Sequence, residues 1–118
     1  MKSDHCQLCA GMVYKIMAEI KIIDRSFTVS RKRGNGTVRY EAWQDNGVVT
    51  RYNLAYINHL IYSGDNGRVL GYDNRHGHHR HCMGAVEPVD TINFEEIEQR
   101  FEQEWTAILE EYHEKHTR

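Results

Sequence analysis

The sequence of 118 residues has no long apolar run, one proline and only three cysteines. No stretch approaches the roughly 20 apolar residues that a membrane-spanning helix needs, and residues 1–10 lack the apolar segment of a signal peptide. These absences exclude an integral membrane protein and a secreted, disulfide-rich domain, and they predict a cytoplasmic protein without membrane contact. In a reducing compartment, an odd number of cysteines favours free thiols or metal ligands over disulfides.

Excess charge of one sign is also missing. A formal net charge of −2 gives no overall attraction to nucleic acid. The charge is nevertheless uneven, because residues 1–93 contain twelve Lys and Arg against nine Asp and Glu, whereas residues 94–118 contain three against eight. We therefore predict a weakly basic body and an acidic C-terminal helix. The glutamates of that helix are either a solvated face or a docking surface for a basic partner.

Alternating apolar residues predict a β-rich region over 13–72, following a polar segment, 1–10, that is predicted to be flexible. Its five expected strands cover 13–23, 26–31, 37–43, 48–62 and 68–72. Turn residues separate them, including Asp24-Arg25, Asn35-Gly36 and Asn46-Gly47. The fourth strand is too long to be regular, so we expect a break near Asn58.

The last segment predicts an amphipathic helix over 93–115. Asn93 is a suitable N-cap with Glu96 three residues later, and apolar residues recur at three- and four-residue spacing: Phe94, Ile97, Phe101, Trp105, Ile108, Leu109 and Tyr112. Strands followed by one closing helix indicate a single α+β domain over 1–118. Its expected form is a twisted antiparallel sheet of about five strands with the helix packed on one face.

A histidine-rich segment over 73–82 is the strongest candidate for a site, and we predict that it forms a loop after the fifth strand. It holds four of the eight histidines of the chain, His76, His78, His79 and His81. Side chains that titrate near neutral pH on a loop suit proton transfer, metal ligation or phosphate contact. A solvated loop without function is the alternative.

Ribonuclease chemistry without a metal is one hypothesis for this loop. It needs a base for the 2′-hydroxyl, an acid for the leaving oxygen and a cation at the phosphorane. We assign His79 and His81 as base and acid, in an order left open, Arg80 as the cation, and Asp73 as the group that orients a histidine. In a regular strand Arg80 would point away from both histidines, so the hypothesis requires an irregular loop.

Other residues are candidates for RNA contact. Arg75 and His78 lie in the same loop, and the basic turn of Arg31, Lys32 and Arg33 either grips phosphates or is simply solvated. Four strand aromatics either stack on bases or belong to the core: Tyr40, Trp43, Tyr52 and Tyr56.

Two alternatives come from other functional classes. The first is a zinc-stabilised binding module without catalysis, whose Zn²⁺ ligands would be Cys6, Cys9, Cys82 and His76. The second is an interaction protein that docks a partner through its acidic helix, with the histidines incidental.

Part of the sequence resembles the TumE family of toxins. The resemblance rests on the run from Arg68 to Asn74, the run from Gly77 to His81, Glu87-Pro88 and the closing helix. It implies a growth-inhibiting bacterial toxin, neutralised by a helix-turn-helix antitoxin, and a homodimer is one option for its assembly. Ribonuclease action without a cofactor is expected by analogy with other small α+β toxins.

Matched to this sequence, the family's motif residues are Tyr72, Asp73, Asn74, His79, Arg80, His81 and Glu87. Family members usually carry an acidic residue before His-Arg-His, where this sequence has His78.

Overall fold

The computed structural model describes residues 18–90 and 93–117. Its strands are β1 (Ile20–Val29), β2 (Gly36–Asp45), β3 (Val48–Ile57), β4 (Arg68–Asp73), β5 (His79–Cys82) and β6 (Ala85–Pro88). Two short 3₁₀ turns, η1 (Arg31–Arg33) and η2 (Asp65–Gly67), and the helix α2 (Phe94–His116) complete the described elements. No helix in this part of the chain is long and apolar enough to span a membrane.

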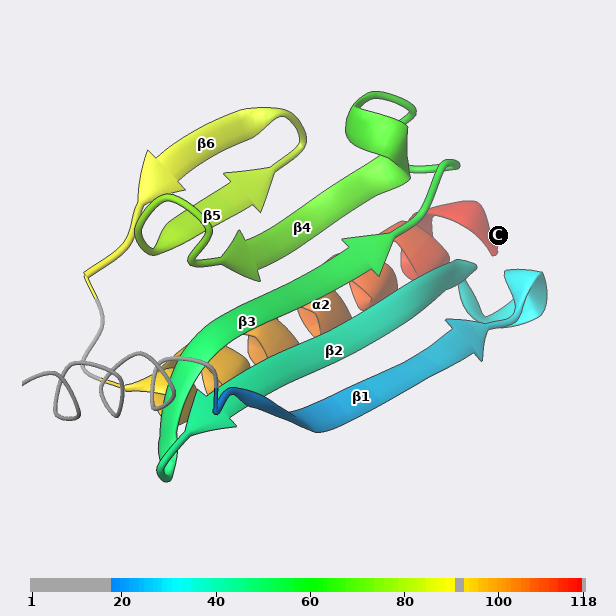
Figure 1. Ribbon diagram of the computed structural model, residues 1–118. Coiled ribbons are helices and arrows are strands. Elements are labelled where there is room, and N and C mark those ends of the chain that lie inside the picture. The colour runs from blue at the N-terminus through cyan, green and yellow to red at the C-terminus, as the bar shows by residue number, and fades with distance from the viewer. Residues whose placement is uncertain (1–17, 91–92, 118) are drawn as a thin grey trace, which may run out of the picture.

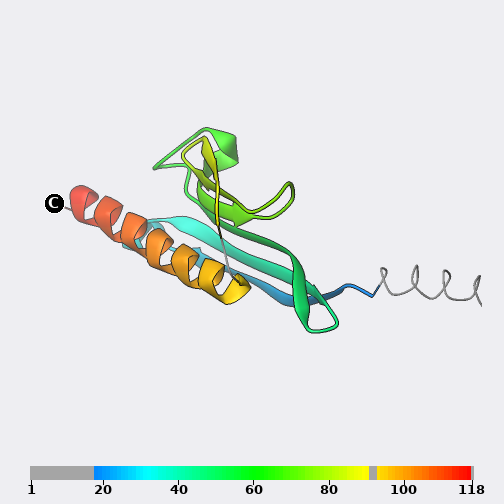
Figure 2. The same ribbon diagram turned by 90° about the vertical axis from the view of Figure 1, so that its left-hand side faces the viewer.

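The strands form one antiparallel sheet in the order β1-β2-β3-β4-β5-β6, so each strand pairs with its neighbour in sequence. Helix α2 runs along one face of this sheet (Figures 1 and 2). Among the described elements, none covers the opposite face, which we call the open face. The predicted α+β fold is confirmed, with six strands.

The local sequence explains the hairpins and the ends of the elements. Asn46 and Gly47 both have positive φ (55° and 83°), as a two-residue hairpin that matches the strand twist requires. Helix α2 begins after Asn93, whose side-chain oxygen accepts a hydrogen bond from the Glu96 N–H (2.9 Å). The predicted helix and its cap are therefore confirmed.

The break predicted near Asn58, within the expected strand over 48–62, is also confirmed, because β3 ends at Ile57. Asn58 is buried there and is satisfied entirely by hydrogen bonds. Its amide donates to the Gly34 carbonyl (3.0 Å), and its oxygen accepts from the Asn35 amide (3.0 Å). A single polar side chain thus ties the end of β3 to the β1–β2 turn.

The core lies between the sheet and α2. Phe101 is fully buried and meets the Tyr40 ring edge-on at 5.2 Å between centroids, while the indole N–H of Trp105 donates to the Tyr40 hydroxyl (3.0 Å). The remaining buried residues on this side include Val38, Ala42, Tyr52, Leu54, Tyr56, Leu70, Tyr72 and Ile97. Tyr40, Tyr52 and Tyr56 are therefore core residues, whereas Trp43 is not.

Two predictions about local structure are wrong. The charged pair Asp24-Arg25 does not form a turn but lies inside β1, because Asp24 pairs with Arg39 and Arg25 lies over the Tyr40 ring. A register shift between Lys21 and Ile23 changes which residues of β1 face the helix. The apolar alternation is interrupted there, so the sequence of one strand resembles that of two.

The second error concerns residues 73–82, which were predicted to be one irregular loop. The loop covers only 74–78, and β5 then pairs regularly with β4 and β6. The segment predicted to be flexible, 1–10, and the start of the first predicted strand, 13–17, lie outside the described residues.

Candidate functional site

The regular structure of β5 divides the histidine-rich motif between two faces of the sheet. Tyr72 lies opposite Arg80 in the β4–β5 ladder, and Asp73 lies opposite His79. Because directly opposed side chains share a face and neighbours along a strand alternate, Arg80 points toward α2. His79 and His81 point to the open face.

On the helix side, Arg80 forms a structural link to α2. Its Nε is 3.1 Å from Glu104 Oε1, its Nη1 is 3.0 Å from Glu87 Oε2, and the Tyr72 hydroxyl donates to Glu104 Oε1 (2.8 Å). Burial lowers the pKa of Arg80, but the hydrogen bond and charge of Glu104 outweigh this effect and raise it above its ordinary value. These contacts join the β5–β6 hairpin to the helix.

Tyr72 belongs to the same link. Burial raises the pKa of Tyr72 to about 12, and the hydrogen bond to the Glu104 carboxylate adds to the effect. Its hydroxyl therefore remains a donor at neutral pH. The role predicted for Arg80 at a phosphate shared with the histidines does not fit this geometry, because its side chain lies with that of Tyr72 on the other side of the sheet.

On the open face, three side chains form a connected cluster, Arg68–His81–Asp73. His81 Nε2 is 2.9 Å from Asp73 Oδ2, and His81 Nδ1 is 3.1 Å from Arg68 Nη2. Arginine can only donate, so Nδ1 accepts and the proton of a neutral His81 lies on Nε2, where Asp73 holds it. The predicted orienting contact between Asp73 and a histidine is present in the structure.

Sequence reasoning missed Arg68 as a member of the site. Strict alternation would place it on the helix side with Leu70 and Tyr72. A register shift between Tyr56 and Ile57 places Arg68 opposite Ile57, so Arg68 shares the open face with Gly71, where an added Cβ would lie only 2.8 Å from the Arg68 Cδ. The glycine in the run Arg68-Val69-Leu70-Gly71 was the available signal, since a glycine inside a strand often marks the close approach of another group.

The loop after β4 is fixed by the Asp-Asn pair. Asp73 Oδ1 accepts the Arg75 backbone N–H (3.2 Å). Asn74 bridges to β3, accepting from the Tyr52 N–H and donating to the Thr50 carbonyl, both at 3.0 Å. Asn74 therefore holds the backbone around the cluster, while the exposed Arg75 borders a groove on the open face.

The other histidines of the motif have different surroundings. His79 Nδ1 donates to the Gly77 carbonyl (2.9 Å), which leaves Nε2 as the proton acceptor of the neutral ring. His78 instead stacks on Tyr52, with 5.7 Å between ring centroids and 2.8 Å between Nδ1 and the hydroxyl. Burial, followed by the charge of Asp73, raises the pKa of Tyr52 to about 12. His76 is exposed in the loop.

Other predicted residues are not brought to the cluster. The turn of Arg31, Lys32 and Arg33 is exposed at the far end of the β1–β2 hairpin (Figure 1). Cys82 is half-buried against the core, and it pairs with Leu70 at the end of β5 opposite the loop that carries His76. No group of three metal-ligating side chains occurs among the described residues, and Cys6 and Cys9 lie outside them.

Comparisons with known proteins bear on the identity of the chain. No curated protein and no solved structure gives a significant match. A family model described as Toxin TumE matches residues 13–112, which includes the whole sheet and most of α2. The match covers more than half of the chain, and membership of a toxin family implies an antitoxin partner. On the ground of this match, the chain belongs to the TumE toxin family.

Proposed function

We propose that this toxin is an endoribonuclease that needs no metal and that cleaves RNA at the open face of β4 and β5. The observation that carries the proposal is the cluster Arg68–His81–Asp73, with His79 two residues away on the same face. The cluster combines a histidine held by a carboxylate with a cation beside it. These are groups that metal-free RNA cleavage uses.

The reaction proceeds by attack of a 2′-hydroxyl on the neighbouring phosphorus. A bond forms between the 2′-oxygen and phosphorus, the bond from phosphorus to the 5′-oxygen breaks, and one histidine accepts a proton while the other gives one to the leaving oxygen. The base begins as a neutral ring and the acid as an imidazolium, which gives its extra proton to the leaving oxygen. The nitrogens that exchange protons are Nε2 of His79 and Nδ1 of His81, the latter once Arg68 has turned from the ring to the phosphate. Arg68 replaces Arg80 as the cation that stabilises the phosphorane.

The partners follow from the same proposal. The family implies an antitoxin, and we infer a protein with a helix-turn-helix domain. Arg31, Lys32 and Arg33 add a long-range attraction for the RNA backbone at the edge of the sheet. Every catalytic group in the proposal belongs to one chain, so catalysis requires no second copy.

Growth after induced expression in bacteria tests the proposal, with His81→Ala and His79→Ala beside the wild type at equal abundance. His76→Ala is the matched control, because His76 lies exposed in the adjacent loop and its side chain makes no hydrogen bond, ion pair or ring contact among the described residues. We expect the wild type and His76→Ala to stop growth and the other two variants to allow it. Growth arrest by His81→Ala would refute the site.

Purified protein then tests the chemistry. Each histidine variant is expected to cleave RNA about 10²–10⁴-fold more slowly than the wild type. Cleavage should continue in the presence of a metal chelator and should leave a 2′,3′-cyclic phosphate. Loss of cleavage on chelation would refute the metal-free mechanism.

A further inference from the structure

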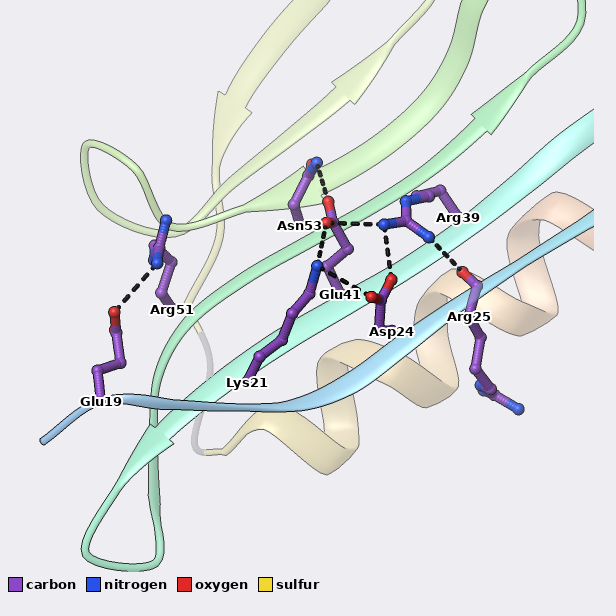
Figure 3. Close-up of polar contacts among 8 residues, drawn as sticks. All are labelled: Glu19, Lys21, Asp24, Arg25, Arg39, Glu41, Arg51 and Asn53. Carbon is purple, nitrogen blue, oxygen red and sulfur yellow. Dashed lines mark hydrogen bonds and ion pairs between the residues drawn. The ribbon is translucent and has the colours of Figure 1, made fainter.

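The strand register arranges the open face in polar rows that cross the sheet. Asp24, Glu41, Asn53, Asp73 and His79 lie opposite one another on successive strands, β1 to β5. A neighbouring row contains Lys21, Trp43 and Arg51. The candidate catalytic cluster therefore continues, without a covering element in the described structure, into a charged and aromatic surface. Figure 3 shows part of its charged side chains.

Most charges in the first row compensate one another. Glu41 contacts Lys21 (2.8 Å) and Arg39 (2.9 Å), and it accepts a hydrogen bond from the Asn53 amide (3.3 Å), as Figure 3 shows. The hydrogen bond from Lys21 holds the pKa of Glu41 below its ordinary value, so the carboxylate stays charged. We interpret this network as structural support for the open face and not as a ligand-binding group.

The network around Glu41 does not explain why a tryptophan, Trp43, lies on this face. It is half-buried on a polar face, whereas Trp105 lies in the core and is only 8% exposed. The Arg51 guanidinium lies 3.9 Å from the centroid of the Trp43 ring, and the Lys21 ammonium lies 4.9 Å from it. Both cations lie over the indole, so an unpaired base stacks on it once Arg51 turns from the ring to the phosphate of the same nucleotide.

The position of Trp43 connects it to the site. Trp43, Arg51, Arg68, Asp73 and Arg75 line one groove on the open face. Trp43 is two strands and one row from Asp73, which corresponds to about 12 Å from ordinary strand spacing and rise. A few nucleotides of single-stranded RNA can span such a distance.

We propose that Trp43, with Arg51 and Lys21, is a binding subsite for an unpaired nucleobase near the scissile phosphate. The inference rests on the proposed ribonuclease function and narrows its substrate class to single-stranded RNA. Bases in a duplex are stacked and paired, so they do not reach the indole face. The contact between Arg51 and Glu19 (3.0 Å) is exposed, and bound RNA displaces it in favour of phosphate.

Binding to a non-cleaving protein tests the subsite. In a His79→Ala/His81→Ala background, Trp43→Ala is compared with Trp43→Phe, using anisotropy of a labelled single-stranded RNA oligonucleotide. We expect Trp43→Ala to bind about 5- to 150-fold more weakly, the range for loss of one base–aromatic stack, and Trp43→Phe to bind nearly as well as its parent. The melting temperature of each variant verifies that it is folded.

Tryptophan fluorescence gives an independent measure. Single-stranded RNA should quench the emission of the parent, and Trp43→Phe should lose this quenching while keeping its affinity, because the remaining Trp105 is buried. A duplex of the same sequence should produce neither quenching nor binding that depends on Trp43.

The outcomes separate this inference from the proposed function. If Trp43→Ala binds the single strand within twofold of its parent, the subsite is refuted even when the wild type cleaves RNA. If binding depends on Trp43 but the wild type does not cleave RNA, the subsite stands and the ribonuclease proposal fails. Binding of the duplex with the same dependence on Trp43 would overturn the assignment to single strands.

Discussion

The two faces of the sheet at β4 and β5 use the same kinds of side chain for different purposes. Toward α2, Arg80 is held by Glu104 and Glu87, and the site is closed by the helix. On the open face, Arg68 contacts His81, Asp73 and Asp65, and no helix of the described structure lies over them. One arginine joins the sheet to α2, whereas the other belongs to the candidate catalytic cluster.

This difference teaches that neighbouring residues of a motif need not share a site. His79, Arg80 and His81 are consecutive, yet strand alternation separates the arginine from the histidines by the thickness of the sheet. Mutations on the helix side should therefore lower stability, whereas mutations on the open face should lower activity.

Phe101→Ala should give the largest effect on stability. Phe101 is fully buried between the Tyr40 and Tyr72 rings, and truncation of such a side chain costs about 3–5 kcal/mol. Urea denaturation measures the loss, and toxicity should disappear together with folded protein. A Phe101→Ala protein of wild-type stability would contradict the assignment of this face to the core.

Arg80→Ala should destabilise the fold by about 1–3 kcal/mol, because Glu104 loses its charged partner. The folded fraction should still cleave RNA at close to the wild-type rate. Cleavage assays give the rate, and denaturation curves give the folded fraction. Dividing the first by the second gives the cleavage rate per folded molecule. A hundredfold lower rate in fully folded Arg80→Ala would return this residue to the catalytic site.

The next largest effect is expected at alkaline pH, which should lower the free energy of unfolding. The pKa values of Tyr52 and Tyr72 are about 12 in the folded chain and ordinarily 10.0. Between these values the unfolded chain loses the phenolic protons and the folded chain keeps them, so stability is complete below pH 10 and falls as pH rises toward 12. The loss at pH 11 is about 1 kcal/mol per tyrosine.

Urea denaturation at a series of pH values checks this expectation. Tyr72→Phe should flatten the alkaline fall by removing one of the tyrosines that cause it, although burial also raises the pKa values of Tyr40 and Tyr56. An unchanged pH dependence in Tyr72→Phe would show that this residue does not titrate as its burial requires.

Gly71→Ala should have the smallest effect on stability, under about 1 kcal/mol, because the nearest atom to the new methyl group belongs to the flexible Arg68 side chain. The displaced Arg68 should leave His81, and RNA cleavage should fall. Cleavage and denaturation of the same preparation measure both effects. Unchanged cleavage would indicate that Arg68 has no part in the reaction.

The sequence predicts the regular parts of the fold well. The three- and four-residue apolar spacing identifies α2, and Asn46-Gly47 identifies its hairpin, because these patterns depend on contacts close in sequence. Asp24 and Arg25 mislead, since their positions in β1 are stabilised by partners on β2 and α2. Such long-range partners have no local pattern.

The site was predicted in part. The contact between Asp73 and a histidine was foreseen, and the structure assigns it to His81. The strand at His79–Cys82 was missed, because four polar residues lack an apolar alternation and acquire their conformation from pairing with β4 and β6. Arg68 was missed because a register shift between β3 and β4 interrupts the alternation that would place it on the helix side.

The sequential order of the strands has a consequence for when the toxin becomes active. Translation delivers the N-terminal part of a domain first, so the six neighbouring strands leave the ribosome before α2. Until the 23 residues of α2 arrive, the apolar face of the sheet has no cover and the β5–β6 hairpin lacks its link to Glu104. A nonsense mutation before Phe94 should therefore yield a harmless fragment, and a growing cell meets the folded toxin only after α2 has been synthesised.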